Sequence, residues 1–307
     1  MNSYRTDLAV EAFDGQGQPA LPGVDVNRWE EGGVTLTEVI VSDEEAAGLL
    51  GKPIGRYLTL ECGPLRRRDP EVRAAMGNLL AEELGRMLPE LGGDACAMVV
   101  GLGNRQITPD ALGPAVIERT LVTRHLSDQL SALPGLRSVA AIAPGVMGVT
   151  GIETMDAVAR LAELVRPAAM ICIDSLAARD SARVGTTLQL TNTGIQPGAG
   201  VGNHRRALTR ESVGAPVVAI GMPTVIHAAT LARDAFEWLG RQNGEPADEA
   251  ALGHMERALL SGEAGDMIVT PREIDALIQD AAGIIAAALN RALQPGLSDR
   301  EIAALMD

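Results

Sequence analysis

Four short apolar runs, separated by segments with helical spacing, constrain the fold of this chain most strongly. The runs cover residues 95–100, 139–143, 168–173 and 217–220. An uninterrupted apolar run of this length suits a strand that is buried on both faces, as in a parallel sheet. Strands that alternate with helices imply right-handed crossover connections. We therefore predict an α/β fold of three layers, α/β/α, around a mostly parallel central sheet.

Other segments show the same patterns. Strands are predicted over residues 34–41, 56–61 and 186–190, and helices over residues 69–88, 114–130, 154–165 and 227–239. Residues 270–273 (Thr-Pro-Arg-Glu) begin a last helix that runs to about residue 293, because Thr can cap a helix and Pro suits its first turn. We expect residues 1 to about 20 to be poorly packed and residues 240–268 to form a loop.

Charge and aromatic content argue against a nucleic-acid partner. The net charge is −14 and aromatic residues make up 2% of the chain, so phosphate-binding charge and base-stacking platforms are both scarce. The run Arg66-Arg67-Arg68 is either a small anion site or a solvated loop. We find no signal peptide and no apolar run long enough to span a bilayer, so we expect a cytoplasmic protein with no membrane partner.

No pattern in the sequence predicts a metal or another cofactor. Cys62, Cys96 and Cys172 lack metal-ligand spacing, and two of them lie in apolar runs, which fits buried thiols in a reducing compartment. The histidines form no zinc motif, and the serines lack the Gly-x-Ser-x-Gly turn of many serine hydrolases. We therefore expect the protein to work without a cofactor.

Two aspartates follow apolar strands. Asp110 comes shortly after the run at residues 95–100, and Asp174 comes directly after the run at residues 168–173. Ligands bind at the carboxyl ends of parallel strands, so we expect both carboxylates to face one cleft. Two carboxylates with different pKa values can perform acid/base hydrolysis. For each aspartate taken alone, the alternative is a helix cap or a salt-bridge partner.

Glycines surround the first aspartate and form a second cluster later in the chain. Gly101 and Gly103 suggest a dinucleotide-binding loop, but Gln106 occupies a position where that motif has glycine. We interpret them instead as a tight turn that brings Asp110 back over the strand end. The glycine-rich residues 194–203 are either a flexible surface loop or a place where a substrate backbone approaches closely. Glu153 is either a third acid in the cleft or a helix cap.

Motifs along nearly the whole chain resemble those of the spore germination protease family. They are residues 5–11 (RTDLAVE), 55–61 (GRYLTLE), 101–104 (GLGN), 108–114 (TPDALGP), 121–126 (LVTRHL), 143–148 (APGVMG), 150–154 (TGIET), 173–174 (ID), 176–179 (LAAR), 193–195 (TGI), 200–203 (GVGN) and 269–271 (VTP). Because the matches run in order, they are together highly specific.

The resemblance implies an atypical aspartic endopeptidase that degrades small acid-soluble spore proteins during germination. It implies catalysis by Asp110 and Asp174, a zymogen that cuts itself between Asp7 and Leu8, a homotetramer, and a location in the forespore or spore core. The apolar stretch at residues 281–293 also suggests a subunit interface, because it is too continuous for a free helix surface. The implied fold is phosphorylase/hydrolase-like, as in hydrogenase maturation proteases.

The candidate substrate-binding residues are Asn104, Glu153, Arg179, Gly198 and Gly200. Arg179 could pair with the acidic side chain before a scissile bond, and the alternative is a surface salt bridge. The same two aspartates would also suit a maturation-type protease that grips a metal held by its substrate, or a protein that binds a metal or a peptide without turnover. Which aspartate acts as acid and which as base is left open by the sequence.

We predict one peptidase domain over residues 1–307. Residues 1–7 would be a short propeptide, residues 8–94 an N-terminal part with an additional small sheet, residues 95–239 the catalytic α/β core, and residues 240–307 a C-terminal loop and helix. The chain departs from the family pattern at Arg105, where tryptophan is usual, at Gln196, where histidine is usual, and at Asn192, where aspartate is usual. The segment between Leu239 and Met267 is also shorter than the family leads us to expect.

Overall fold

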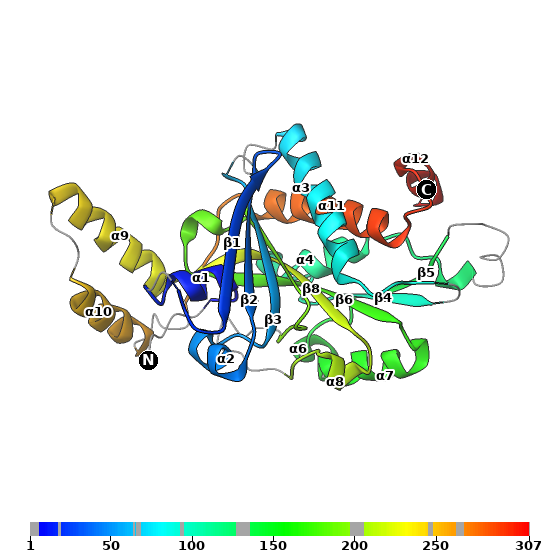
Figure 1. Ribbon diagram of the computed structural model, residues 1–307, viewed down its shortest axis with the longest axis horizontal. Helices are drawn as coiled ribbons and strands as arrows, with labels where there is room; N and C mark the ends of the chain where they lie inside the picture. The colour runs from blue at the N-terminus through cyan, green and yellow to red at the C-terminus, as the bar shows by residue number, and fades with distance from the viewer. Residues whose placement is uncertain are drawn as a thin grey trace.

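One mixed sheet organises the protein (Figure 1). The computed structural model describes residues 6–17, 20–63, 65, 69–92, 95–126, 136–196, 206–244, 248–261 and 267–306. The strand order is β1-β2-β3-β7-β8-β6-β4-β5, and β9 pairs with β8. The strands are β1 (Val24–Glu31), β2 (Val34–Val41), β3 (Gly55–Glu61), β4 (Cys96–Gly101), β5 (Ser138–Ile142), β6 (Ala169–Ala178), β7 (Thr187–Thr191), β8 (Val217–His227) and β9 (Ile268–Val269).

Helices flank this sheet. The α-helices are α1 (Ala9–Asp14), α2 (Glu44–Leu50), α3 (Pro70–Met87), α4 (Leu112–Ile117), α6 (Met147–Thr150), α7 (Thr154–Val165), α8 (Arg210–Val213), α9 (Ala228–Asn243), α10 (Glu249–Ser261), α11 (Ile274–Leu293) and α12 (Asp299–Met306). Short 3₁₀ turns lie at η2 (Thr108–Asp110), η3 (Arg124–Leu126) and η4 (Ser181–Arg183). The predicted helix at residues 154–165 is confirmed. Helix α3 begins at a capping residue, because the Asp69 side chain accepts hydrogen bonds from Glu71 N and Val72 N.

The sheet has a parallel half and an antiparallel half. Strands β8, β6, β4 and β5 are parallel, whereas β1, β2, β3, β7 and β8 pair in antiparallel fashion. The predicted mostly parallel sheet is therefore wrong for the N-terminal half, where Gly32 and Gly33, both with positive φ, join neighbouring strands in a two-residue hairpin. Strands β1–β3 continue the main sheet through β7, so they do not form a separate small sheet.

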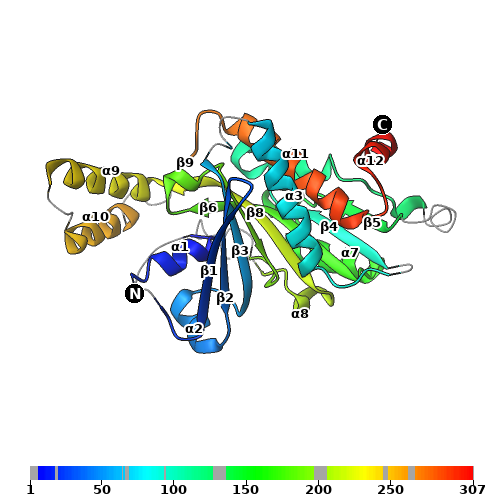
Figure 2. The same cartoon turned by 45° about the horizontal axis from the view of Figure 1, so that its top comes forward.

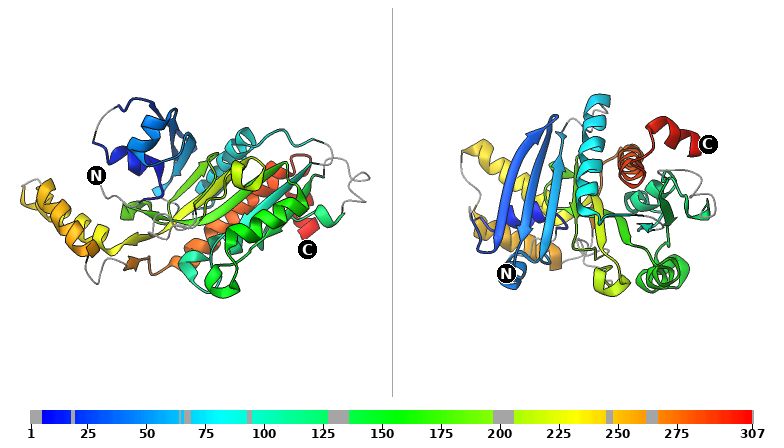
Figure 3. Two further views of the ribbon diagram at one scale, coloured as in Figure 1. Left: turned by 90° about the horizontal axis from the view of Figure 1, so that it is seen from below. Right: turned by 45° about the vertical axis from the view of Figure 1, so that its right-hand side comes forward.

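Strand β6 sends alternate residues into two apolar clusters. Ala169, Ile171 and Ile173 pack with residues of α3, α4 and α11. Met170 and Cys172 pack with residues of α7. Because side chains alternate across a strand, these two sets of helices lie on different faces of the sheet. Figures 2 and 3 show α3 and α11 side by side against the sheet.

Helix α11 is a core helix. By length and composition it is the one described helix that could cross a membrane, but 61% of its apolar window is buried inside the protein. It packs against α3 and α4. The apolar stretch at residues 281–293, which we assigned to a subunit interface, therefore serves the core of a single chain.

Three predicted segments differ from the structure. Residues 240–268, predicted as a loop, contain α10, which packs on α9 in an arm that extends away from the sheet (Figures 1 and 2). The helix predicted at residues 114–130 ends at Ile117, and Leu121 N then donates a hydrogen bond to Asn290 Oδ1 of α11 at 2.8 Å. Of the N-terminal residues that we expected to be poorly packed, Leu8, Ala9 and Val10 are fully buried, whereas residues 1–5, 18 and 19 lie outside the described residues.

Candidate active site

The loop after β4 folds Asp110 back over the end of the strand. Gly103 has φ +112°, and a Cβ added to it would lie 2.0 Å from the Asp110 carbonyl oxygen. Asn104 N donates a hydrogen bond to the same oxygen at 2.9 Å. A Cβ on Gly113 would lie 2.2 Å from Leu102 O, so the chain that follows Asp110 also passes against the strand end. The prediction that glycines make this tight return is confirmed.

Asp174 lies inside β6 rather than beyond it. Strand β4 pairs with β6 only up to Gly101 and Ile173, but β6 continues to Ala178 through its pairing with β8. Asp174 is therefore the first residue of β6 past the end of β4. Its side chain is 5% exposed, and its Oδ1 accepts a hydrogen bond from Ser175 N at 2.9 Å. The predicted strand end was placed too early because β8, which supports the extra residues, was itself predicted too short.

The two aspartates are neighbours through the backbone. Leu102 N donates to Ile173 O at 2.8 Å, which joins the residue before Gly103 to the residue before Asp174. Asp110 Oδ1 lies 3.0 Å from the position of a Gly103 Cβ. Both carboxyl-bearing residues therefore sit at the carboxyl end of the β4–β6 pair, which is where an open α/β sheet binds ligands.

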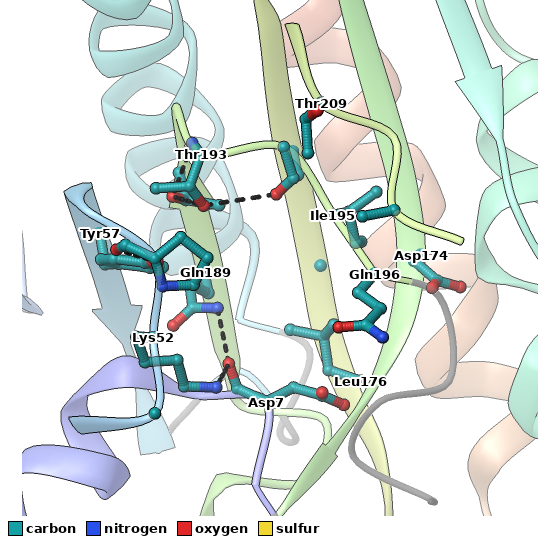
Figure 4. A pocket seen from close by; sticks show the side chains of 17 residues that line it. Asp7, Lys52, Tyr57, Asp174, Leu176, Gln189, Thr193, Ile195, Gln196 and Thr209 are labelled. Carbon is teal, nitrogen blue, oxygen red and sulfur yellow. Dashed lines mark hydrogen bonds between the residues drawn. The ribbon is translucent and has the colours of Figure 1, made fainter. Parts of the chain in front are cut away.

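A pocket of about 170 Å³ opens beside Asp174 (Figure 4). Its wall includes Asp174 and Leu176 from β6, Gln189 and Thr191 from β7, and Gly221 from β8. The N-terminal segment contributes Asp7, the turn after α2 contributes Lys52, and the segment after β7 contributes Gln196. Asp110, which lies on η2, is not in this wall. The prediction that both carboxylates face one cleft is therefore met in this pocket by Asp174 and not by Asp110.

Asp7 is held in the pocket by its main chain and its side chain. Its N–H donates to Ala177 O at 3.0 Å, and its Oδ2 accepts from Ala177 N at 2.8 Å. Its carbonyl oxygen accepts from Lys52 Nζ at 2.9 Å and from Gln189 Nε2 at 3.1 Å. Lys52 Nζ also donates to Thr6 O at 2.9 Å. The carbonyl of the predicted scissile bond, Asp7–Leu8, thus meets two side-chain donors (Figure 4).

The residues after this bond are anchored in the protein. Leu8 is fully buried and packs with Leu176, Ala178, Val184 and Ile226. Ala9 N donates to Gln189 Oε1 at 2.7 Å, so one glutamine side chain bonds to the backbone on both sides of Leu8. These contacts fix residues 8–10 independently of residues 1–7.

Burial and neighbouring charges shift the pKa values of three groups in or near the pocket. Burial lowers the pKa of Lys52, while the charges of Asp7 and Glu11 act in the opposite sense. Burial raises the pKa of Tyr57 to about 12, against a hydrogen bond with Thr193 that lowers it. Burial and then the charge of Asp174 raise the pKa of the Cys172 thiol, which therefore stays protonated.

The structure places the predicted substrate-binding residues in different surroundings. Asn104 helps to fix the Asp110 loop, and its Oδ1 accepts from Gln106 N at 3.0 Å. Glu153 precedes α7, but its side chain makes no capping hydrogen bond, and it lies outside the pocket wall. Arg179 pairs with Glu237 at 3.8 Å, in the manner of the salt-bridge alternative. Gly198 and Gly200 lie outside the described residues, as does the run at residues 66–68.

The departures from the family pattern also differ in their surroundings. Gln196 is in the pocket wall, so this substitution alters the site itself. Asn192 Oδ1 accepts from Arg56 N at 2.9 Å and joins the residue after β7 to the neighbouring strand β3. Arg105 pairs with Glu118 on the outside of the Asp110 loop. In the part of the chain that the structure describes, no group of three or more His, Cys, Asp or Glu side chains could hold a metal ion.

Sequence reasoning missed Lys52 and Gln189. Each lies far along the chain from Asp7, in a segment with no catalytic motif, and the fold alone brings them together. One signal was available, because Lys52 is the only lysine among the 26 basic residues of the chain.

Comparison with known proteins finds a consistent set of relatives. The family profile described as germination protease matches residues 6–262. A germination protease of Caldanaerobacter subterraneus is 41% identical, with 98% of each chain covered. A germination protease of Clostridium tetani is 38% identical over 98% of each chain, and one of Bacillus cereus is 40% identical over 95% of this chain and 94% of its own.

Proposed function

Because this chain belongs to the germination protease family, it is an endopeptidase of spore germination, and we propose that Asp110 and Asp174 activate the water that cuts its substrates. The observation that carries this proposal is the placement of both aspartates at the carboxyl end of the β4–β6 pair, with Asp174 in the wall of a pocket that already holds a peptide segment.

In this mechanism one carboxylate is ionised and the other is protonated. The ionised group takes a proton from a water molecule as that water attacks the scissile carbonyl carbon. The protonated group donates a hydrogen bond to the carbonyl oxygen and then gives its proton to the leaving amine. Two carboxylates that are close together do not readily both ionise, so the pair titrates as a unit.

The substrates in this proposal are small acid-soluble spore proteins, cut in the spore core. The family resemblance supports this choice, and the preference would be for an acidic residue followed by an apolar one. The protein is made as a zymogen that removes residues 1–7, and the docking of Asp7 in the pocket supports self-cleavage at Asp7–Leu8. We also propose a homotetramer and a three-layer fold related to hydrogenase maturation proteases.

The deciding experiment compares the wild type with Asp110→Asn and Asp174→Asn on a purified spore protein. An amide keeps the size of the side chain but cannot transfer the proton, so both variants should lose turnover while melting near the wild-type temperature. The aspartate pair is the wrong assignment if either variant cuts at close to the wild-type rate. Activity that EDTA abolishes and added metal restores would favour the maturation-type alternative.

A further inference from the structure

Asp7 occupies a slot that recognises each of its polar groups. Ala177 bonds to its N–H and its carboxylate, and Lys52 and Gln189 donate to its carbonyl oxygen. Leu8, Ala9 and Val10, by contrast, are fully buried parts of the apolar clusters. Cleavage at Asp7–Leu8 would therefore release residues 1–7 and leave the residues after the bond in place.

The emptied slot would be lined mainly by donors that have lost their acceptors, beside one freed acceptor, Ala177 O. Lys52 Nζ would lose both carbonyl oxygens that it now contacts, and Ala177 N and Gln189 Nε2 would lose Asp7. The new N-terminal ammonium of Leu8 would add a second positive charge. Buried donors and cations cost free energy unless they bind an acceptor. The emptied slot would therefore favour an anionic group.

The slot is also within reach of the proposed catalytic group. Asp174 and Asp7 line the same pocket, and Ala177 lies in the same strand, three residues after Asp174. In strand geometry, Asp174 and Ala177 are about 10 Å apart along β6. A substrate residue with an acidic side chain, together with the residue next to it, spans this distance. A substrate anchored by its acidic side chain can therefore present a neighbouring peptide bond to Asp174.

We propose that the slot vacated by residues 1–7 is the subsite for the acidic residue of the protein substrate, with Lys52 as its cation. Asp7 occupies this subsite before cleavage and excludes other acidic residues from it. The inference rests on the proposed function, because it takes Asp7–Leu8 as the self-processing bond.

The choice of lysine at position 52 fits this role. Every other basic residue among the 26 in the chain is arginine. A compact ammonium can donate to two carbonyl oxygens from adjacent residues, Thr6 and Asp7, whereas the planar guanidinium is suited to a forked carboxylate. The same ammonium can turn its donors to a carboxylate once those carbonyls leave.

The first test measures specificity. The full chain is allowed to process itself, loss of residues 1–7 is followed by intact mass, and kcat/KM is measured on matched peptides with Glu or Gln before an apolar residue. We expect the kcat/KM of the wild type to be about tenfold or more higher for the Glu peptide than for the Gln peptide, because only Glu makes a charged contact with Lys52. Lys52→Met should bring the ratio close to one by raising KM for the Glu peptide, while Lys52→Arg should retain the preference.

Controls separate this inference from the proposed function. Arg160→Met removes an exposed ion pair on α7 and should leave the ratio unchanged. If Lys52→Met lowers kcat/KM equally for the Glu and Gln peptides, the role of Lys52 is structural and the proposed subsite is wrong. If the wild type digests spore protein but keeps residues 1–7, the slot is never vacated and the subsite is wrong, although the peptidase assignment stands. If the wild type cuts no substrate, the proposed function itself fails.

The second test uses the single lysine as a chemical probe. An amine-selective acetylating reagent can modify Lys52 and the N-terminal amine, and digestion followed by mass spectrometry distinguishes them. Lys52 should react slowly in the full chain and faster after loss of residues 1–7, and N-acetylglutamate amide should protect it whereas N-acetylglutamine amide should not. Equal reactivity before and after processing, or equal protection by both compounds, would overturn the proposal.

Discussion

The buried Glu11 and the partly buried Arg183 form an ion pair, with 3.4 Å between the carboxylate oxygen and the guanidinium nitrogen. The Glu11 carboxylate also accepts from Arg179 N at 2.7 Å and from Asp180 N at 2.8 Å. A single side chain of α1 therefore holds the N-terminal helix to the turn that follows β6. Since Asp7 lies four residues before Glu11, this pair fixes the segment that enters the pocket.

Glu11→Gln should destabilise the protein by about 2–4 kcal/mol, because Arg183 would lose a buried partner and the two backbone donors would lose a charged acceptor. Urea unfolding measures the free energy. Asp14→Asn is the matched control, because Asp14 contacts the same guanidinium at 3.5 Å with a side chain that is 46% exposed, and it should cost less than about 1 kcal/mol. Equal effects of the two variants would contradict a special role for Glu11.

The closeness of Gly103 to Asp110 gives the second prediction. Gly103→Ala should lower kcat/KM by about 100-fold or more, because a Cβ 2.0 Å from the Asp110 carbonyl must displace the loop that places the carboxylate. Peptide cleavage measures the loss. Gly48→Ala in α2 is the control, because a Cβ there meets no atom within 4 Å, and it should leave activity unchanged. A fully active Gly103→Ala would show that the geometry of this loop does not set the rate.

The sequence predicted the parts of this fold that depend on local patterns. The buried strand that ends at Gly101 and the helix Thr154–Val165 follow from the spacing of their apolar residues. The edge strand β1 was missed because most of its residues are polar and at least partly exposed, which hides the alternation. The length of β6 could not be predicted, because residues 174–178 are held in the sheet by β8 rather than by their own pattern.

The candidate active site also contains residues that the sequence predicts and residues that it does not. Asp110 and Asp174 stand near the ends of recognisable apolar runs, and they could be named from the sequence alone. The contact of Lys52 with Asp7 joins residues whose hydrogen bond spans 45 positions, and that of Gln189 spans 182. Neither contact has a local signal, because both arise when β3 pairs with β7 and brings their neighbouring segments to the same pocket.

Tyr57 provides a test in alkaline solution. Burial raises its pKa from 10.0 to about 12, so in the folded state it keeps its proton where the unfolded chain has lost it. Its contribution to stability is therefore fully present below pH 10 and is lost as the pH rises towards 12, by about 2 kcal/mol in all. Unfolding free energies measured between these pH values should fall less steeply in Tyr57→Phe. An unchanged slope would show that Tyr57 ionises normally.

The arm formed by α9 and α10 gives the last prediction, which concerns assembly. Phe236, Trp238 and Leu239 are each about half exposed on α9 (54%, 56% and 48%), in a chain with few aromatic residues. Since α11 is used by the core, we expect the proposed homotetramer to bury these side chains. Trp238→Lys should shift the mass measured by light scattering towards smaller species at micromolar concentration, with the helical circular dichroism retained. Leu49→Lys, which changes a similarly exposed residue on α2, should leave the mass unchanged. A Trp238→Lys protein that keeps the wild-type mass would place the subunit contacts elsewhere, and a wild type that is monomeric at this concentration would rule out the tetramer.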